Sequence, residues 1–155
     1  NMELWSGVAL RRHAPGKAAL FGRAGYLAAL EKGVAVFGPR MVRSLVIVGL
    51  EPVEDTLSAV RALVEIGVVP VLSPLRPLRG TVLQHLLPPE PGLLEEVHER
   101  ALEICVNAGT SLGPTCAGCH GNTLSVHGLS DVCPRASSDG QDGGGQGDSS
   151  KPRPR

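Results

Sequence analysis

The sequence has few aromatic residues, no net charge and no apolar run long enough to cross a bilayer. Aromatic residues make up 3% of the 155 residues, so the core must be built from aliphatic side chains. Fifteen Lys and Arg residues balance 15 Asp and Glu residues, and a neutral chain has no overall field that attracts nucleic acid or a membrane surface. The longest apolar run lies around residues 45–50, far short of a transmembrane helix. We therefore expect a soluble, cytoplasmic protein with neither nucleic acid nor membrane as partner.

Four cysteines in a chain of this size could form a disulfide framework, but no signal peptide opens the chain. The four cysteines are Cys105, Cys116, Cys119 and Cys133, and a CxxC pair without a secretory leader favours redox or metal chemistry over a disulfide framework. Cys105 falls on the apolar stripe of a predicted helix, so we interpret it as a small core residue. Cys133 precedes a polar tail and is expected to be a free thiol. The scattered histidines, His13, His85, His98 and His127, are expected at the surface or in loops.

Hydrophobic periodicity predicts three strands, each followed by a helix. The strands are expected over 1–5, 43–50 and 68–75, and the helices over 26–37, 52–66 and 94–108. The stretch RSLVIVGL is apolar on both faces, which is typical of a parallel strand covered by helices. Three strand–helix units in a row predict an α/β fold, specifically a partial (β/α) TIM-type barrel.

The remaining segments are predicted to be irregular. Pro15 and Gly16 indicate a turn within a loop over 11–17, and 76–92 is a long connection of the kind that carries function. From Pro134 the chain consists of small and polar residues, which predicts disorder. The expected organisation is a barrel portion over 1–112, a CxxC-containing cap over 113–133 and a tail over 134–155.

The sequences at the ends of the three predicted strands resemble the second half of a radical S-adenosylmethionine enzyme of the biotin-synthase-like kind. These sequences are NMELW, IVGLE, and PVLSPLRPLRGTVL, and the resemblance extends over residues 1–125. In that family, an Asn-x-acid pair on the fourth strand holds the ribose of S-adenosylmethionine, so the resemblance assigns this role to Asn1 and Glu3. An apolar residue on the fifth strand packs on adenine, which corresponds to Ile47 followed by Gly49. Glu51 comes one place earlier than the acid of the family motif.

The resemblance also implies contacts from the sixth strand. Its Pro-containing end, whose backbone lies near adenine in the family, corresponds to Val69–Leu72 and so to Pro70 and Leu72. The Gly-Thr-x-Leu turn that follows corresponds to Gly80–Leu83. Arg76, just beyond the strand, is a candidate for binding an anionic group of a small-molecule substrate.

The family motif that binds the iron–sulfur cluster is absent. No CxxxCxxC occurs in the sequence, and Cys116 and Cys119 have the wrong spacing and position to replace it. The resemblance therefore implies that a missing N-terminal half holds the [4Fe–4S] cluster at which the complete enzyme forms a 5′-deoxyadenosyl radical. This chain alone is expected to bind the nucleoside part of the cofactor, to be inactive, and to associate with that half or with itself.

Cys116 and Cys119 leave several interpretations open. They would serve as two ligands of an auxiliary iron–sulfur cluster or of a zinc ion, with His127 and Cys133 within reach along the chain, or they would be a pair without a ligand. A thioredoxin-like role is disfavoured because the CxxC does not open a helix after a strand. Two other readings of the whole chain remain: a non-enzymatic protein that binds structural zinc or a partner, and an intact small α/β enzyme.

Overall fold

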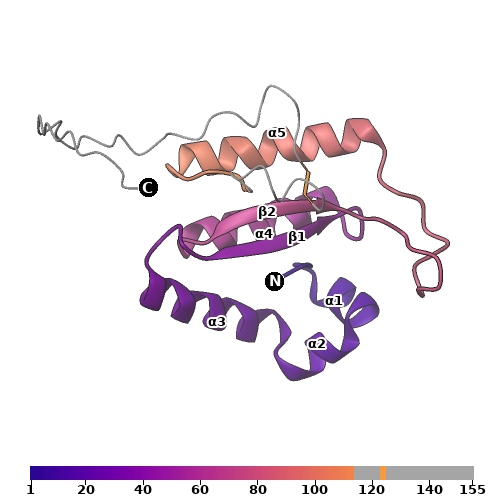
Figure 1. The fold of residues 1–155 in the computed structure, drawn as a ribbon, viewed down its shortest axis with the longest axis horizontal. Helices are drawn as coiled ribbons and strands as arrows, with labels where there is room; N and C mark the ends of the chain where they lie inside the picture. The colour runs from indigo at the N-terminus through magenta and orange to yellow at the C-terminus, as the bar shows by residue number, and fades with distance from the viewer. Residues whose placement is uncertain (114–122, 125–155) are drawn as a thin grey trace, which may run out of the picture.

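The structure, a computed structural model, describes residues 1–113 and 123–124, arranged around a two-stranded parallel sheet. The strands are β1 (Arg43–Val48) and β2 (Val69–Pro74), paired in register from Arg43 opposite Val69 to Val48 opposite Pro74. The helices are α1 (Gly7–His13), α2 (Pro15–Leu20), α3 (Gly22–Phe37), α4 (Val53–Glu65) and α5 (Pro91–Asn107). In Figure 1 the strands lie between α3 and α5, and α4 crosses behind them.

Side chains alternate between the two faces of β1 and β2. Val46, Val48 and Leu72 pack in one buried cluster with Leu57, Val60 and Leu63 of α4. The same cluster includes Val97, Ala101 and Cys105 of α5, so one face of the sheet is covered by these two helices. Residues 43, 45, 47, 69, 71 and 73 belong to the opposite face, which we call the α4-distal face. The strand–helix–strand unit and the aliphatic core agree with the sequence-based expectation.

The predicted boundaries of the later helices are confirmed to within a few residues. Pro52 is the N-cap of α4, and Glu54 and Asp55 lie in its first turn, where carboxylates favour the positive end of the helix dipole. Gly38 ends α3 with φ 92°, a backbone conformation that glycine adopts without steric cost. The segment between β2 and α5 has no regular helix or strand, as predicted, although α5 begins at Pro91 and so includes the last two residues of the predicted connection over 76–92.

Isolated bridges extend the parallel arrangement on both sides of the sheet. Glu3 pairs with Val46, and Val71 pairs with Gly113, both in parallel orientation. The spatial order of the four paired segments therefore follows their order along the chain. A Cβ added to Gly113 would lie 3.1 Å from Cγ2 of Val71, which shows how closely that backbone packs on β2. Sequential parallel neighbours joined by helices are the arrangement found in a barrel wall, although the described sheet proper contains only β1 and β2.

The first 20 residues differ from the sequence-based expectation. The stretch Asn1–Trp5 forms one bridge rather than a strand, because Glu3 has φ 64° and breaks the extended conformation. The predicted loop over 11–17 is wrong: it contains the end of α1 and the start of α2. Pro15 occupies the first turn of α2, a position where its missing N–H leaves no helix hydrogen bond unmade.

An exposed charge network links α4 and α5. Arg100 of α5 hydrogen-bonds to Glu54 of α4 and, at 3.1 Å, to Glu96 one turn away.

Across residues 1–113 and 123–124, no helix combines the length and the apolar character needed to traverse a bilayer.

His98 was expected at the surface but lies in the core, with a side chain only 3% exposed on α5. Burial lowers the pKa of His98 from its ordinary 6.5, and the nearby Glu99 partly opposes this shift. Its contribution to stability is therefore fully present above pH 6.5 and is lost as the pH falls toward the lower folded-state pKa. We expect the melting temperature of the wild type to fall more between pH 7.5 and pH 5 than that of a His98→Leu variant. Equal decreases in the two proteins would contradict this prediction.

Candidate cofactor site

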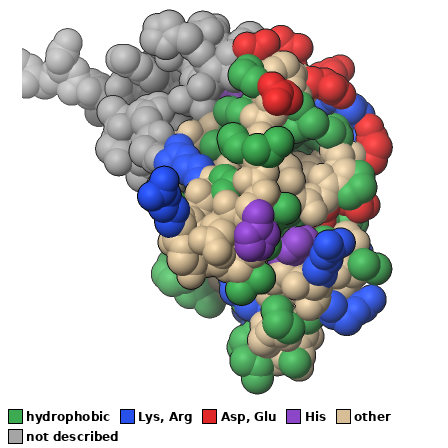
Figure 2. Space-filling view, turned by 90° about the vertical axis from the view of Figure 1, so that its right-hand side faces the viewer, with side chains coloured by type: hydrophobic (Ala, Val, Ile, Leu, Met, Phe, Trp, Pro, Cys, Tyr) green, Lys and Arg blue, Asp and Glu red, His purple; other side chains and the backbone are tan. Residues whose placement is uncertain are grey.

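The carboxyl ends of β1 and β2 lie at the end of the molecule that also carries α1 and the connection to α5 (Figure 1). Figure 2 looks at this end: acidic side chains gather toward its upper right, and basic side chains with exposed histidine lie lower and to the side. In parallel α/β folds, ligands bind at the carboxyl ends of the strands. This end is therefore where the residues assigned by resemblance must meet if they form one site.

Asn1 and Glu3 are held beside β1 by several hydrogen bonds. The backbone N–H of Glu3 donates to Leu45 O at 2.8 Å, and Ile47 N–H donates to Glu3 O at 2.8 Å. The side-chain oxygen of Asn1 accepts from Leu45 N–H at 3.3 Å. The carboxylate of Glu3 forms an ion pair with Lys17 of α2 through Oε2, at 2.6 Å. This ion pair links the segment beside β1 to α2.

Glu51 has a structural role that the sequence did not reveal. Its carboxylate accepts from Trp5 N–H at 2.9 and 3.0 Å and from Ser6 N–H at 2.9 Å. Ser6 is the N-cap of α1, so Glu51 fixes the point at which the N-terminal stretch enters that helix. Burial raises the pKa of Glu51 above its ordinary 4.5, and the hydrogen bonds from Ser6 and Trp5 partly offset this effect. An acidic residue just after a strand was the only sequence signal for this contact.

Ile47 and Gly49 lie where β1 ends. The side chain of Ile47 is half-buried on the α4-distal face, opposite Ser73 in the register with β2. Gly49 has φ 105°, and a Cβ at this position would lie 2.3 Å from Cγ of Pro89. Gly49 therefore permits both the turn after β1 and the close approach of the segment that precedes α5. The structure brings Glu3 and Ile47 together, since their backbones share a hydrogen bond.

Pro70 and Leu72 are placed differently. Both side chains are fully buried, and Leu72 belongs to the core cluster beneath α4 and α5. Their carbonyl oxygens accept from Gly113 N–H and Leu124 N–H, each at 2.8 Å. Both side chains are therefore packed in the core, and both carbonyl oxygens are hydrogen-bonded to neighbouring backbone N–H groups.

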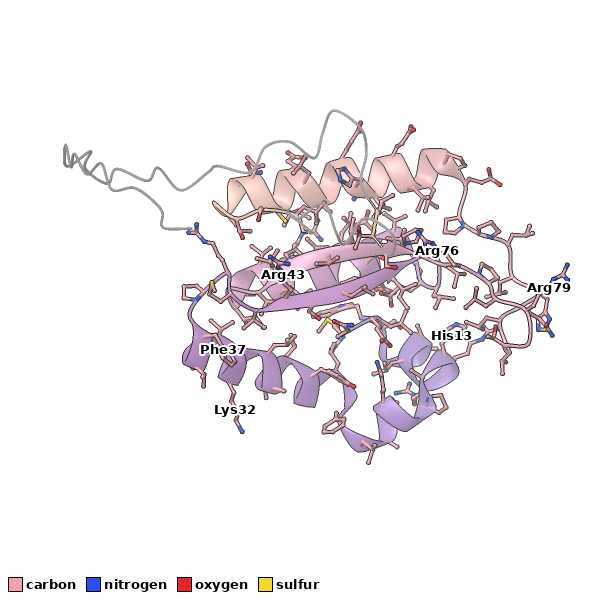
Figure 3. All side chains as sticks on the ribbon, viewed as in Figure 1. His13, Lys32, Phe37, Arg43, Arg76 and Arg79 are labelled. Atoms are coloured by element: carbon pink, nitrogen blue, oxygen red, sulfur yellow. The ribbon has the colours of Figure 1, made fainter. Side chains whose placement is uncertain are left out.

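Arg76 follows β2 at the same end of the sheet. Figure 3 shows it just beyond the strand, above His13 at the end of α1, whereas Arg43 lies at the opposite end of β1. The Arg76 side chain is exposed. An exposed guanidinium at the carboxyl end of a parallel strand is well placed to meet a carboxylate or phosphate group.

The cysteine motif lies outside the described residues, as do His127 and Cys133 and the tail over 134–155. Within the part that is described, no three His, Cys, Asp or Glu side chains are grouped as a metal site requires. Cys105 is free and fully buried, which confirms its interpretation as a core residue.

Cys105 should resist alkylation in the folded protein. Burial raises the pKa of its thiol from 9.0 to about 12, so the reactive thiolate is scarce at neutral pH. Mass spectrometry after iodoacetamide treatment at pH 7.5 should find the Cys105 peptide unmodified under native conditions and modified in denaturant. Because the folded-state pKa is raised, the contribution of Cys105 to stability is present below pH 9 and is lost as the pH approaches 12. Rapid native labelling of Cys105 would contradict its placement.

Comparison with known proteins adds no relative: no protein-family model, curated protein or solved structure matches the chain.

Proposed function

We propose that this chain is the C-terminal, nucleoside-binding half of a radical S-adenosylmethionine enzyme. The observation that carries the proposal is the meeting of Asn1 and Glu3 with Ile47 at one place, although Ile47 lies more than 40 positions from both along the chain. The backbones of Glu3 and Ile47 share a hydrogen bond on adjacent parallel segments, and the side-chain oxygen of Asn1 accepts from the N–H of Leu45, two positions before Ile47. The sequential parallel order of residues 3, 46, 71 and 113 supports a partial (β/α) barrel as the scaffold.

The two ends of a nucleoside need different surroundings, and this site offers both. Ribose hydroxyls donate to carboxylate oxygens and exchange hydrogen bonds with amides, so Glu3 and Asn1 are suited to hold them. Adenine has apolar faces, and the half-buried side chain of Ile47 provides a surface for one of them. Gly49 carries no side chain beside Ile47, and the ring of Pro89 fills the position that a Cβ would take. Pro70 and Leu72 contribute through the position of the β2 backbone, since their side chains are in the core.

The cluster that supplies an electron to S-adenosylmethionine in this family would be held by residues that are not in this sequence. The present chain would bind and orient the nucleoside, and Arg76 would hold an anionic group of the small-molecule substrate. Apolar side chains exposed near the end of α3 support a partner, either the cluster-bearing half or a second copy. Val36, Phe37 and Met41 are 74, 69 and 72% exposed, and Phe37 extends away from the sheet in Figure 3.

An amide chemical-shift map tests the location of the nucleoside. Addition of S-adenosylmethionine to the ¹⁵N-labelled chain should shift the amide signals of residues 1–5, 47–51 and 73–76. The signals of α5 should stay in place, because that helix covers the other face of the sheet. Shifts confined to α5, or no saturable shift at millimolar ligand, would contradict the proposal.

We further propose an auxiliary iron–sulfur cluster or zinc ion at Cys116 and Cys119. Two thiolates separated by two residues bind one metal ion or cluster. Anaerobic purification followed by metal and sulfide analysis separates the alternatives: brown protein with acid-labile sulfide indicates a cluster, and colourless protein with one zinc indicates a structural metal. If Cys116→Ser and Cys119→Ser left the metal content unchanged, neither a cluster nor a zinc ion would be bound by these two cysteines.

A further inference from the structure

A cavity of about 470 Å³ lies between α1, α2 and the start of α3, and its lining residues come from these helices. Its apolar wall includes Leu10, Pro15 and Ala18. This volume is within the range of small-molecule pockets, which combine an apolar lining with a few placed polar groups. The cavity therefore has room for a ligand with an aliphatic body.

Two arginines supply the charged groups of the cavity lining. Arg11 comes from α1, and its guanidinium folds back over Gly7, where an added Cβ would lie 3.5 Å from Nη1. Arg23 comes from α3, and its guanidinium stacks on the Trp5 ring at 4.4 Å while Nη1 hydrogen-bonds to Trp5 O at 3.4 Å. The stacked arginine is thus held in place before any ligand arrives, which reduces the entropy lost on binding.

The cavity carries positive charge without an internal counter-charge. None of its lining residues is acidic, and in the ranges 1–113 and 123–124 the ion pairs involve Lys17 and Arg100 but neither Arg11 nor Arg23. Guanidinium groups bind carboxylate and phosphate oxygens through paired hydrogen bonds. An apolar wall flanked by two guanidiniums is complementary to a ligand with an apolar body and an anionic head.

We propose that this cavity binds a small amphiphilic anion, with its carboxylate or phosphate head between Arg11 and Arg23 and its aliphatic body against Leu10, Pro15 and Ala18. The proposal does not depend on the nucleoside site. It concerns a different part of the chain and a different ligand chemistry, so either site could exist without the other.

Fluorescence of Trp5 gives a direct readout, because it is the single tryptophan of the chain and stacks on Arg23. We expect hexanoate and hexyl phosphate to change this fluorescence saturably. The probe that binds with the higher affinity shows whether the cavity prefers a carboxylate or a phosphate head group. Hexanol, with the same aliphatic body and no charge, should bind at least about tenfold more weakly, since a charge-assisted hydrogen bond contributes about that factor. Hexylammonium should bind more weakly still, because the two guanidiniums repel it.

Matched variants test whether the anion binds in this cavity. Arg11→Ala should weaken hexanoate binding about tenfold, whereas Arg12→Ala, a neighbouring exposed arginine that does not line the cavity, should leave it unchanged. Arg11 is exposed, so its variant is expected to fold, which circular dichroism checks. Ala19→Leu should also weaken binding by filling the cavity. Hexylammonium binding as tightly as hexanoate, equal effects of the two arginine variants, or no saturable response to either anion would overturn the proposal.

Discussion

Replacement of Gly49 by alanine should lower the free energy of unfolding by about 3 kcal/mol, combining backbone strain and overpacking. Gly49 has φ 105°, and the new Cβ would lie 2.3 Å from Cγ and 3.3 Å from Cδ of Pro89. The ring of Pro89 is a rigid obstacle, and Pro89 is half-buried, so neither side can give way without moving the backbone. Chemical denaturation with the Trp5 signal would measure the loss.

Two other glycines separate the causes of this loss. Gly80 has φ 81° with no atom within 4 Å of an added Cβ, so Gly80→Ala carries the backbone cost alone, about 1–2 kcal/mol. Gly16 lies in α2 with open space around it and no positive φ, so Gly16→Ala should be neutral or slightly stabilising. Removing the ring with Pro89→Ala should recover part of the Gly49→Ala loss. If Gly49→Ala were no more harmful than Gly80→Ala, the packing of Pro89 on the turn after β1 would be wrong.

Glu51→Ala should lower the free energy of unfolding by about 2 kcal/mol, because it leaves two partly buried N–H groups without acceptors. These are the N–H groups of Trp5 and Ser6, both bound by the Glu51 carboxylate. The loss should be local as well as global: hydrogen exchange at Trp5 and Ser6 should accelerate more than exchange in α5. A variant with normal protection at these two amides would contradict the assigned role.

Glu51→Gln is the matched control for charge, since it keeps one acceptor oxygen. The pKa of Glu51 is raised in the fold by burial, so its carboxyl group binds a proton more readily in the folded state than in the unfolded chain. Its ionisation therefore reduces stability as the pH rises from 4.5 through the higher folded-state pKa. A neutral acceptor avoids this penalty, so Glu51→Gln should cost clearly less than Glu51→Ala at pH 7.

Segments with strong local patterns were predicted well from the sequence. The apolar run of β1 and the stripe of Leu57, Val60 and Leu63 indicate a strand and a helix from local patterns. Gly38 and Gly67 follow the ends of α3 and α4 with φ 92° and 80°, and this backbone property is local to each glycine. The core position of Cys105 followed from its helical spacing with Val97 and Ala101. Each of these features depends on residues close together in the sequence.

The features that were missed depend on contacts between distant residues. Pro15 and Gly16 favour a turn locally, yet the packing of Ala18 with Leu4 and Leu10 in a small second cluster stabilises helices there. His98 is polar, and only its place between α5 and the core determines that it is buried. The contacts of Glu51 with Trp5 and Ser6, and of Glu3 with Lys17, join residues whose spacing carries no motif. The pairing of Gly49 with Pro89 likewise spans 40 positions.

The most direct test of the nucleoside-binding proposal is the affinity for S-adenosylmethionine of two variants that break the same ion pair. Glu3→Ala and Lys17→Ala each remove the contact between Glu3 and Lys17, but only the first removes the carboxylate. Isothermal titration should show saturable binding by the wild type and by Lys17→Ala. Glu3→Ala should bind about tenfold or more weakly, because a hydrogen bond from a ribose hydroxyl to a carboxylate is lost. Equal affinities of the two variants, or no binding by the wild type, would contradict the account.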